Sequence, residues 1–162
     1  MKEQKKEKMS LILFSGDLDK ALAAFHLSTG ATTMGMDSCI FFTFWGINLL
    51  RKKENKVAVK KNFIDKLFGS MMPKGPTDLK LSKMNMGGLG TKMMKKIMKD
   101  KDQVSLDTLM KTATDAGVKF IACTSSMEMM GICKEELIEN IELGSVATYL
   151  KESIDADIRL FI

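Results

Sequence analysis

The sequence predicts a three-layer α/β sandwich in which helices cover both faces of about five mostly parallel strands. Short apolar runs alternate with stretches in which apolar residues recur at helical spacing, a pattern typical of βαβ units. The chain has 162 residues, of which 45% are hydrophobic, so it is long enough to bury one substantial core. With two prolines it has no proline-rich linker. We expect a charged tail over residues 1–9 and one domain over residues 10–162.

The first βαβ unit is expected directly after the tail. Leu11–Phe14 form a continuous apolar run, which suits a strand buried on both faces. Apolar residues then recur at helical spacing to about Met34, with Asp17 as the expected helix cap. Ser38–Phe44 are rich in β-branched and aromatic residues and predict a second strand. A strand, a helix and a strand over so short a stretch imply a right-handed unit with parallel strands.

The same alternation returns in the last third of the chain. Apolar residues at helical spacing over 106–113 predict a helix that ends at Gly117, and a buried strand is expected over Val118–Ala122. A short strand over Ile141–Leu143, a helix opened by Gly144 and Ser145, and a last strand over Ile158–Ile162 complete the predicted sheet.

Residues 67–101 do not follow this alternation and are interpreted as an inserted, methionine-rich arm. It contains both prolines and seven of the fifteen methionines, at Met71, Met72, Met84, Met86, Met93, Met94 and Met98. Methionine fills irregular gaps or coats a surface that accepts another apolar surface. The arm is therefore either packed on its own domain or a docking surface for a partner protein. Contact with an anionic membrane surface is a third, less favoured interpretation, because the apolar face beside Lys92, Lys95, Lys96 and Lys99 is short.

Charge is distributed unevenly along the chain. Residues 1–99 hold 19 lysines and arginines against 8 acidic residues, whereas residues 100–162 hold 6 against 12. The basic residues near the middle are not interleaved with aromatic residues and match no nucleic-acid-binding motif, so we expect a solvated face and no nucleic-acid partner. These residues are Arg51, Lys52, Lys53, Lys56, Lys60 and Lys61. The basic half also suits an acidic partner protein or an anionic small molecule.

Several classes of protein and site are not expected. Three cysteines are too few for a secreted disulfide framework, which favours a reducing cytoplasm. The longest apolar run, Cys39–Leu50, is shorter than the roughly 20 residues of a spanning helix. The cysteines lack the spacing of a zinc site, and Gly87–Lys92 lacks that of a phosphate-binding loop, so neither a metal nor a cofactor is predicted. The one histidine, His26, falls within a predicted helix and is interpreted as structural.

Cys123 is the candidate catalytic residue because of its position. It follows the predicted strand Val118–Ala122, and ligands of parallel α/β sheets gather at the carboxyl ends of strands. Ser125 and Glu128 fit a capping box that would start a helix two or three residues beyond the sulfur, where helix amides favour a thiolate. A thiolate there can attack a sulfane sulfur and hold it as a persulfide. The alternative is that Cys123 is a small hydrophobic residue finishing a buried strand.

Other residues at the expected strand ends are candidates for binding or support in the same crevice. Their backbone amides would hold an anionic acceptor, and Trp45 would exclude water; equally, they would serve only as caps and packing. They are Ser15, Gly16, Asp17, Trp45, Gly46, Thr124, Ser125, Ser126, Gly144 and Ser145. Cys39 lies at the opposite end of the sheet and is interpreted as core. Cys133 is expected on an exposed connection, as an idle thiol or one that resolves an oxidised Cys123.

Five segments in this order resemble the DsrE/DsrF-like family, in its long subgroup labelled peroxiredoxin-like: Ser15–Ala21, Phe41–Gly46, Leu81–Met86, Ala122–Gly131 and Val146–Leu150. The resemblance implies a flavodoxin-like sandwich, assembly into dimers, trimers or hexamers, and a role in relaying sulfur between proteins. The sulfur-bearing cysteine of the family matches Cys123. Ser125 stands where the subgroup usually has methionine, and the peroxidatic motif of true peroxiredoxins is absent before Cys123.

The leading hypothesis is a cytoplasmic sulfur carrier of sulfurtransferase type, in which Cys123 takes sulfur from a donor protein and a partner's thiol receives it. The second hypothesis is a non-catalytic, oligomeric adaptor that uses the methionine-rich arm to dock a partner. A nucleotide or flavin binder on a flavodoxin-like sheet is a third hypothesis, and the missing phosphate-binding loop places it last.

Overall fold

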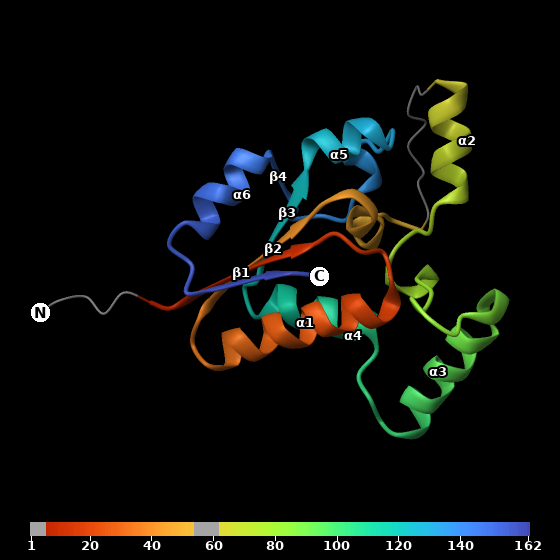
Figure 1. The fold of residues 1–162 in the computed structure, drawn as a ribbon, viewed down its shortest axis with the longest axis horizontal. Helices are drawn as coiled ribbons and strands as arrows, with labels where there is room; N and C mark the ends of the chain where they lie inside the picture. Colours follow the sequence, from red (N-terminus) through yellow and green to blue (C-terminus); the bar gives the residue numbers. More distant parts are fainter. Residues whose placement is uncertain (1–5, 54–61) are drawn as a thin grey trace, which may run out of the picture.

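A computed structural model describes residues 6–53 and 62–162, which form a mixed α/β fold around one parallel sheet (Figure 1). The strands are β1 (Lys8–Leu13), β2 (Asp37–Phe42), β3 (Lys119–Cys123), β4 (Glu142–Gly144) and β5 (Ile158–Phe161). They lie in the order β4-β3-β2-β1-β5, and all four pairings are parallel. The predicted class of fold is confirmed. The bounds of β2 to β5 agree with the predicted strands to within two residues, whereas β1 begins three residues before the predicted Leu11.

Helices cover both faces of the sheet. On one face lie α1 (Leu18–Thr33) and α4 (Leu106–Asp115), which contact each other. On the other face lie α5 (Thr124–Met129) and α6 (Val146–Ser153) (Figure 1). These are the three layers that the sequence predicted. The prediction followed from the continuous apolar runs, because a strand covered by helices on both faces has apolar side chains at nearly every position.

Aromatic side chains fill the core on both sides of the sheet. Towards α1 and α4, the rings of Phe25, Phe42 and Phe120 pack with centroids 5.4 to 6.2 Å apart. Towards α6, Phe41 packs on Tyr149 at 5.1 Å. Phe41 and Phe42 are adjacent in β2, so their contacts with opposite layers show that this central strand is covered on both faces.

The sheet begins earlier than the sequence indicated. Lys8 and Met9 lie within the predicted charged tail, yet they are the first two residues of β1. Met9 is buried against α1, and the Lys8 side chain reaches Glu152 on α6. A charged residue within the strand is tolerated here because its ammonium is paired, which the linear pattern did not show.

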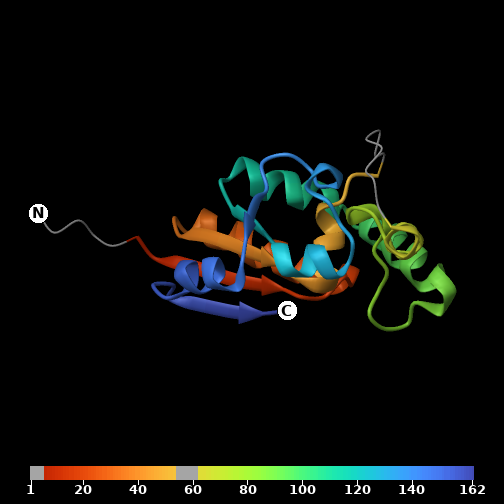
Figure 2. The ribbon, with the colours of Figure 1, turned by 90° about the horizontal axis from the view of Figure 1, so that it is seen from above.

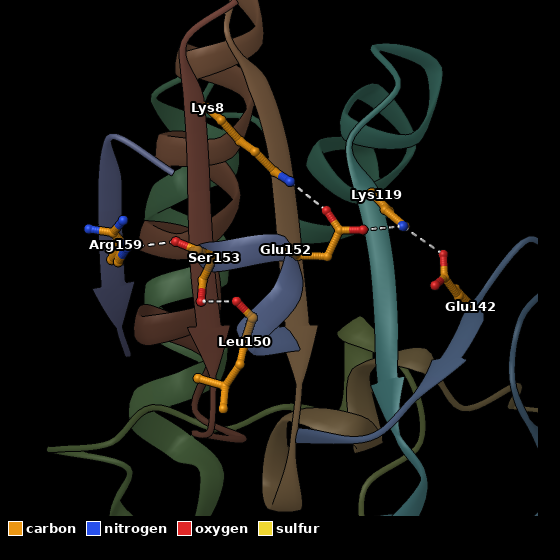
Figure 3. Close-up of polar contacts among 7 residues, drawn as sticks. All are labelled: Lys8, Lys119, Glu142, Leu150, Glu152, Ser153 and Arg159. Atoms are coloured by element: carbon orange, nitrogen blue, oxygen red, sulfur yellow. Dashed lines mark hydrogen bonds and ion pairs between the residues drawn. The ribbon is translucent and has the colours of Figure 1, made fainter. Parts of the chain in front are cut away.

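An ion-pair network lies near the amino ends of the strands (Figure 3). Glu152 on α6 accepts hydrogen bonds from Lys8 on β1 and from Lys119 on β3, and Lys119 also pairs with Glu142 on β4 at 2.9 Å. The hydrogen bonds from Lys119 and Lys8 lower the pKa of the Glu152 carboxyl. Hydrogen bonding to Glu152 and Glu142 raises the pKa of Lys119. The network fastens α6 across three strands.

Between β2 and α4 the chain forms the arm, which lies beyond the carboxyl ends of the strands (Figure 1 and Figure 2). It comprises α2 (Phe63–Met71), short 3₁₀ turns at Pro76–Asp78 and Met86–Gly88, and α3 (Leu89–Asp100), so we extend it to Phe63, four residues before the predicted bound at Leu67. Within it, the hydroxyl of Thr91 accepts from Leu81 N–H and donates to Asn85 Oδ1, at 2.9 and 2.8 Å, which fixes the start of α3 against the preceding loop.

A buried ion pair anchors the arm to the domain. The Arg51 guanidinium lies 3.2 Å from Glu136 Oε2 and donates at 3.0 Å to the carbonyl of Gly69 on α2. Arg51 is 3% exposed, so its interpretation as part of a solvated basic face is wrong. Its charge is compensated by a partner 85 residues away, which no local pattern reveals. Lys56, Lys60 and Lys61 of the same predicted face lie outside the described residues.

Candidate functional site

Cys123 occupies the carboxyl end of β3, at the point where the connections of the sheet change sides. The connections that follow β1 and β2 contain α1 and α4, on one face of the sheet, and those that follow β3 and β4 contain α5 and α6, on the other face (Figure 1). The reversal therefore falls between β2 and β3. Ligand sites of open α/β sheets lie at such a reversal, outside the carboxyl ends of the strands.

The helix after Cys123 begins closer to the sulfur than predicted. Cys123 is itself the N-cap of α5, which begins at Thr124, and no side chain caps its first turn. The predicted capping box of Ser125 and Glu128 is therefore wrong. Strand and helix are joined without an intervening turn, so Ser125 falls inside the first helical turn, where its side chain is exposed.

The crevice at the end of β3 is covered. Cys123 is 2% exposed, so the expectation of an open strand-end thiol is wrong for this conformation. The 3₁₀ helix η1 (Phe44–Leu50) packs against β3 and α5, and its Ile47 and Leu50 are completely buried, so we infer that η1 covers Cys123. Because η1 follows β2 directly, it lies across the reversal between β2 and β3. The sequence suggested only the end of a strand at this position.

One side-chain hydrogen bond joins this cover to the helix that follows Cys123. The hydroxyls of Thr43, just before η1, and Ser126 on α5 are 2.9 Å apart. Ser126 is buried and Thr43 is half-buried, so water has restricted access to this hydrogen bond. Sequence reasoning identifies Ser126 but misses Thr43, which lies inside the predicted strand Ser38–Phe44. The strand β2 ends two residues before that predicted end, at Phe42.

The other neighbour of Cys123 is the end of β4. Gly144 pairs with Cys123 across the two strands, and the Thr124 hydroxyl lies 3.4 Å from the Gly144 carbonyl. A Cβ at residue 144 would lie 2.8 Å from Ile121 Cγ2, so glycine permits close packing here. The Ser145 side chain accepts a hydrogen bond from the N–H of Thr148 and caps α6. Thr124, Ser126 and Gly144 are thus the predicted site residues that lie around Cys123.

The remaining predicted site residues form a separate group around the end of β1. Ser15, Gly16, Asp17 and Trp45 line a pocket of about 380 Å³, which Cys123 does not line. Within it the Ser15 hydroxyl donates to Asp17 at 2.8 Å, and Lys20 pairs with Asp17 at 3.1 Å. The Asp17 carboxylate in this pocket is already paired with Lys20 and Ser15, and none of the lining residues belongs to β3.

Gly46 has a packing role beneath this pocket. Its N–H donates to the Phe14 carbonyl at 3.0 Å, and a Cβ at residue 46 would lie only 2.1 Å from the Leu13 carbonyl oxygen. The residue therefore allows η1 to press against the end of β1. Close backbone approach, rather than ligand binding, accounts for glycine at this position.

The other two cysteines have different surroundings from Cys123. Cys39 on β2 is 1% exposed, as expected for a core residue, and its burial raises the pKa of its thiol. Cys133 is half-buried and begins the short 3₁₀ turn Lys134–Glu136. Its N–H donates to Glu136 Oε1 at 3.0 Å, and its sulfur accepts from the Glu136 N–H. Cys133 therefore has a capping role that the sequence did not suggest.

Metal and membrane features are absent from the part of the chain that the structure describes. Residues 6–53 and 62–162 contain no group of three or more histidines, cysteines or acidic residues able to hold a metal ion. Over the same residues, no helix is both long enough and apolar enough to cross a bilayer.

Comparisons with known proteins place this chain in a family. A model of the DsrE/DsrF/DrsH-like family matches residues 5–161, nearly the whole chain. The chain belongs to this family. It is 44% identical over 162 residues to the uncharacterized protein YrkE of Bacillus subtilis, with all of both chains covered. It is 34% identical over 165 residues to the sulfur carrier protein DsrE2 of Allochromatium vinosum, with 99% of each covered.

A solved structure supports the fold of this DsrE-like chain independently of sequence. The ychN protein from E. coli superposes with a TM-score of 0.54 over 96% of this chain and 99% of the other, at 11% identity. Identity this low supports the arrangement of strands and helices alone. The resemblance found in the sequence motifs is thus confirmed at the level of family and of fold.

Proposed function

We propose that this protein is a sulfur carrier that binds sulfane sulfur as a persulfide on Cys123 and passes it to a thiol of a partner protein. The observation that carries the proposal is the position of Cys123, at the reversal between β2 and β3 and directly before a helix. Membership of the DsrE/DsrF/DrsH-like family and the likeness to a protein named as a sulfur carrier support a sulfur-relay role.

The proposed exchange is balanced without a metal or a cofactor. The Cys123 thiolate attacks the outer sulfur of a donor persulfide, a new S–S bond forms, and the donor's S–S bond breaks. The donor leaves as a thiolate, which takes up the proton that Cys123 released. An acceptor thiolate then attacks the outer sulfur on Cys123, which returns to its starting thiolate. One sulfane sulfur moves in each step, with no net oxidation.

Exchange at Cys123 requires local opening, because the thiol is covered. The cover is held at α5 by the hydroxyl pair of Thr43 and Ser126, and α5 is a helix of six residues without a side-chain cap. Short helices without caps are among the elements that open locally at low free-energy cost. Separation of η1 from α5 would bring Cys123 to the surface without unfolding the sheet.

Intact-protein mass spectrometry tests the proposed persulfide. After incubation with a sulfane donor such as polysulfide, the wild-type chain should gain about 32 Da per sulfur, and dithiothreitol should remove the gain. Cys123→Ser should abolish it, whereas the matched controls Cys39→Ser and Cys133→Ser should retain it. A reducible gain of equal yield in Cys123→Ser would contradict the assignment.

The arm supports a second candidate function, that of a docking surface for a partner protein or for copies of this chain. Apolar side chains are exposed at four-residue intervals on both of its helices: Phe63, Leu67 and Met71 on α2, and Leu89, Met93 and Ile97 on α3. Such rows are unusual on surfaces that face only water. From the family resemblance and these exposed rows we infer a homo-oligomer of two, three or six copies. The low number of cysteines supports a cytoplasmic location.

Substitutions on the exposed row of α3 separate docking from sulfur loading. The double variant Met93→Ser/Ile97→Ser should reduce the oligomer mass measured by light scattering, or abolish transfer to an acceptor protein, while Cys123 still gains sulfur. The control is Lys92→Ser/Lys96→Ser on the same helix. Unchanged assembly and unchanged transfer in the apolar double variant would exclude this role for the α3 row.

A further inference from the structure

A groove of about 450 Å³ lies between the arm and the domain, on the side of α1 and α4. It is separate from the end of β3, because none of its lining residues neighbours Cys123. The arm contributes the turn at Pro76 and the last two turns of α3. The domain contributes the first residues of α1 and α4, so two separate parts of the fold form its walls.

The walls combine an apolar surface with two cations. Leu18, Pro76, Met98 and Leu106 supply the apolar part, and Lys95 and Lys99 project from α3 on the same side, four residues apart. One acidic side chain, Asp107 on α4, also lines the groove. The titratable side chains that line it therefore carry a net positive charge.

Lys95 is incompletely neutralised. Its ammonium donates to the backbone carbonyl of Thr77 at 2.6 Å, and among the described residues it makes no ion pair. Burial lowers the pKa of Lys95, and the carboxylate of Asp78 opposes this effect from a distance. A carbonyl oxygen satisfies one of the three N–H donors of an ammonium and leaves its charge uncompensated.

We propose that this groove binds a small amphipathic organic anion, with a carboxylate or sulfonate group on Lys95 and Lys99 and an apolar body against Leu18, Met98 and Leu106. Charge complementarity assigns the head group, since an anion would supply the acceptors that Lys95 lacks. The apolar lining assigns the body, because burial of a hydrocarbon portion there removes apolar surface from water on both sides. A groove of this volume is within the range of small-molecule sites.

The bound anion would join the arm to the domain. Its head group contacts α3, whereas its body contacts the first turns of α1 and α4. A ligand that binds only when the arm is packed on the domain stabilises that arrangement by mass action. Saturation of the groove with the anion should therefore slow amide hydrogen exchange in α3. This effect does not depend on the chemistry of Cys123, and Cys123→Ser should bind the anion with unchanged affinity.

Titration of the ¹⁵N-labelled full chain with naphthalene-1-sulfonate tests the proposal, with uncharged naphthalene-1-sulfonamide as the control ligand. Saturable shifts should concentrate at Leu18 and at residues 95–107. Lys95→Met, which keeps most of the side-chain volume, should weaken binding about tenfold, as expected for loss of a charge-assisted hydrogen bond. The matched control Lys96→Met, which alters an exposed residue outside the lining, should change the affinity less than about twofold.

Three results would overturn the proposal. They are an absence of saturable shifts up to millimolar probe, equal loss of affinity in Lys95→Met and Lys96→Met, and shifts centred on Met93 and Ile97 instead of the groove. Equal affinity for the sulfonamide would refute the role of the cations. The ¹⁵N spectrum of each variant establishes that it is folded, and Lys99→Met, which should also weaken binding, replaces Lys95→Met if the latter is not.

Discussion

A buried cysteine lies towards each end of the parallel strands. We call the side where the strands begin the amino edge and the side where they end the carboxyl edge, and the two are closed in different ways. At the amino edge, Cys39 is 1% exposed and lies near the network in which Glu152 links Lys8 to Lys119. At the carboxyl edge, Cys123 is 2% exposed and is covered by η1 and α5. The first edge is closed by charged hydrogen bonds that join α6 to β1 and β3, and by the ion pair that joins β3 to β4. The second is closed by short helices and one pair of hydroxyls.

This comparison shows that exposed fraction alone does not separate a structural thiol from a reactive one. The two cysteines differ little in burial, and the difference lies in what must move to uncover each. Exposure of Cys39 would require α6 to break the two ion pairs of Glu152, whereas exposure of Cys123 would require a six-residue helix to part from η1. Local opening follows the cheaper route, which is at the carboxyl edge.

The largest expected effect comes from removal of the close contact beneath η1. Gly46→Ala places a methyl group where 2.1 Å separates it from the Leu13 carbonyl oxygen, so η1 must shift. We expect a loss of about 3 kcal/mol in the free energy of unfolding, as for overpacked sites, measured by urea denaturation. Gly30→Ala in α1, where a Cβ would meet nothing within 4 Å, is the control and should be neutral or stabilising.

Glu152→Gln tests the closure of the amino edge. It should lower the free energy of unfolding at pH 7 by about 1–2 kcal/mol, because Lys8 and Lys119 lose a shared carboxylate. Loading of sulfur on Cys123 should be unchanged, as the carboxyl edge is intact. A loss of loading in proportion to the loss of stability would show that the two edges are coupled.

The pH dependence of the same variant sharpens this test. The pKa of Glu152 is lowered in the folded chain, so its stabilising contribution is present above the ordinary glutamate value of 4.5 and is lost as the pH falls through the folded pKa. The difference in stability between the wild type and Glu152→Gln should therefore shrink between pH 6 and pH 3, a range of about three units. A constant difference over this range would contradict the proposed role of the carboxylate.

The smallest expected effect is on the hydroxyl pair at the carboxyl edge. Ser126→Ala removes the hydrogen bond to Thr43 and should make local opening easier by about 1 kcal/mol, which corresponds to about fivefold faster alkylation of Cys123. The exposed neighbour Ser125→Ala is the control and should leave the rate unchanged. Slower alkylation in Ser126→Ala than in Ser125→Ala would show that the hydrogen bond does not hold the cover closed.

The sequence predicted the layers and strands because they depend on local patterns. Continuous apolar runs marked β1 and β2, and the turn at Gly117 marked the start of β3. The position of Cys123 at the carboxyl end of β3 followed from the predicted strand Val118–Ala122. Side chains whose role depends on distant partners were not predictable in this way, and Arg51 is the clearest case, since its charge is paired with Glu136.

The details of the site could not be obtained from spacing alone. Ser125 and Glu128 have the spacing of a capping box, but β3 continues into α5 without a turn, so the cap falls on Cys123. The cover over the thiol arises because η1 fills the reversal between β2 and β3, a contact between segments more than 70 residues apart. The sequence grouped the site residues in one crevice because they follow predicted strands. The structure instead divides them between the surroundings of Cys123 and the pocket at the end of β1.

Native-state alkylation of the three thiols, resolved by peptide mapping, tests the central claim most directly. With limiting iodoacetamide at neutral pH, Cys123 should be modified at least about tenfold faster than Cys39, at a rate insensitive to Glu152→Gln. Equal rates for Cys39 and Cys123, or modification of Cys123 only at the rate of global unfolding, would contradict the account of a carboxyl edge that opens to exchange sulfur.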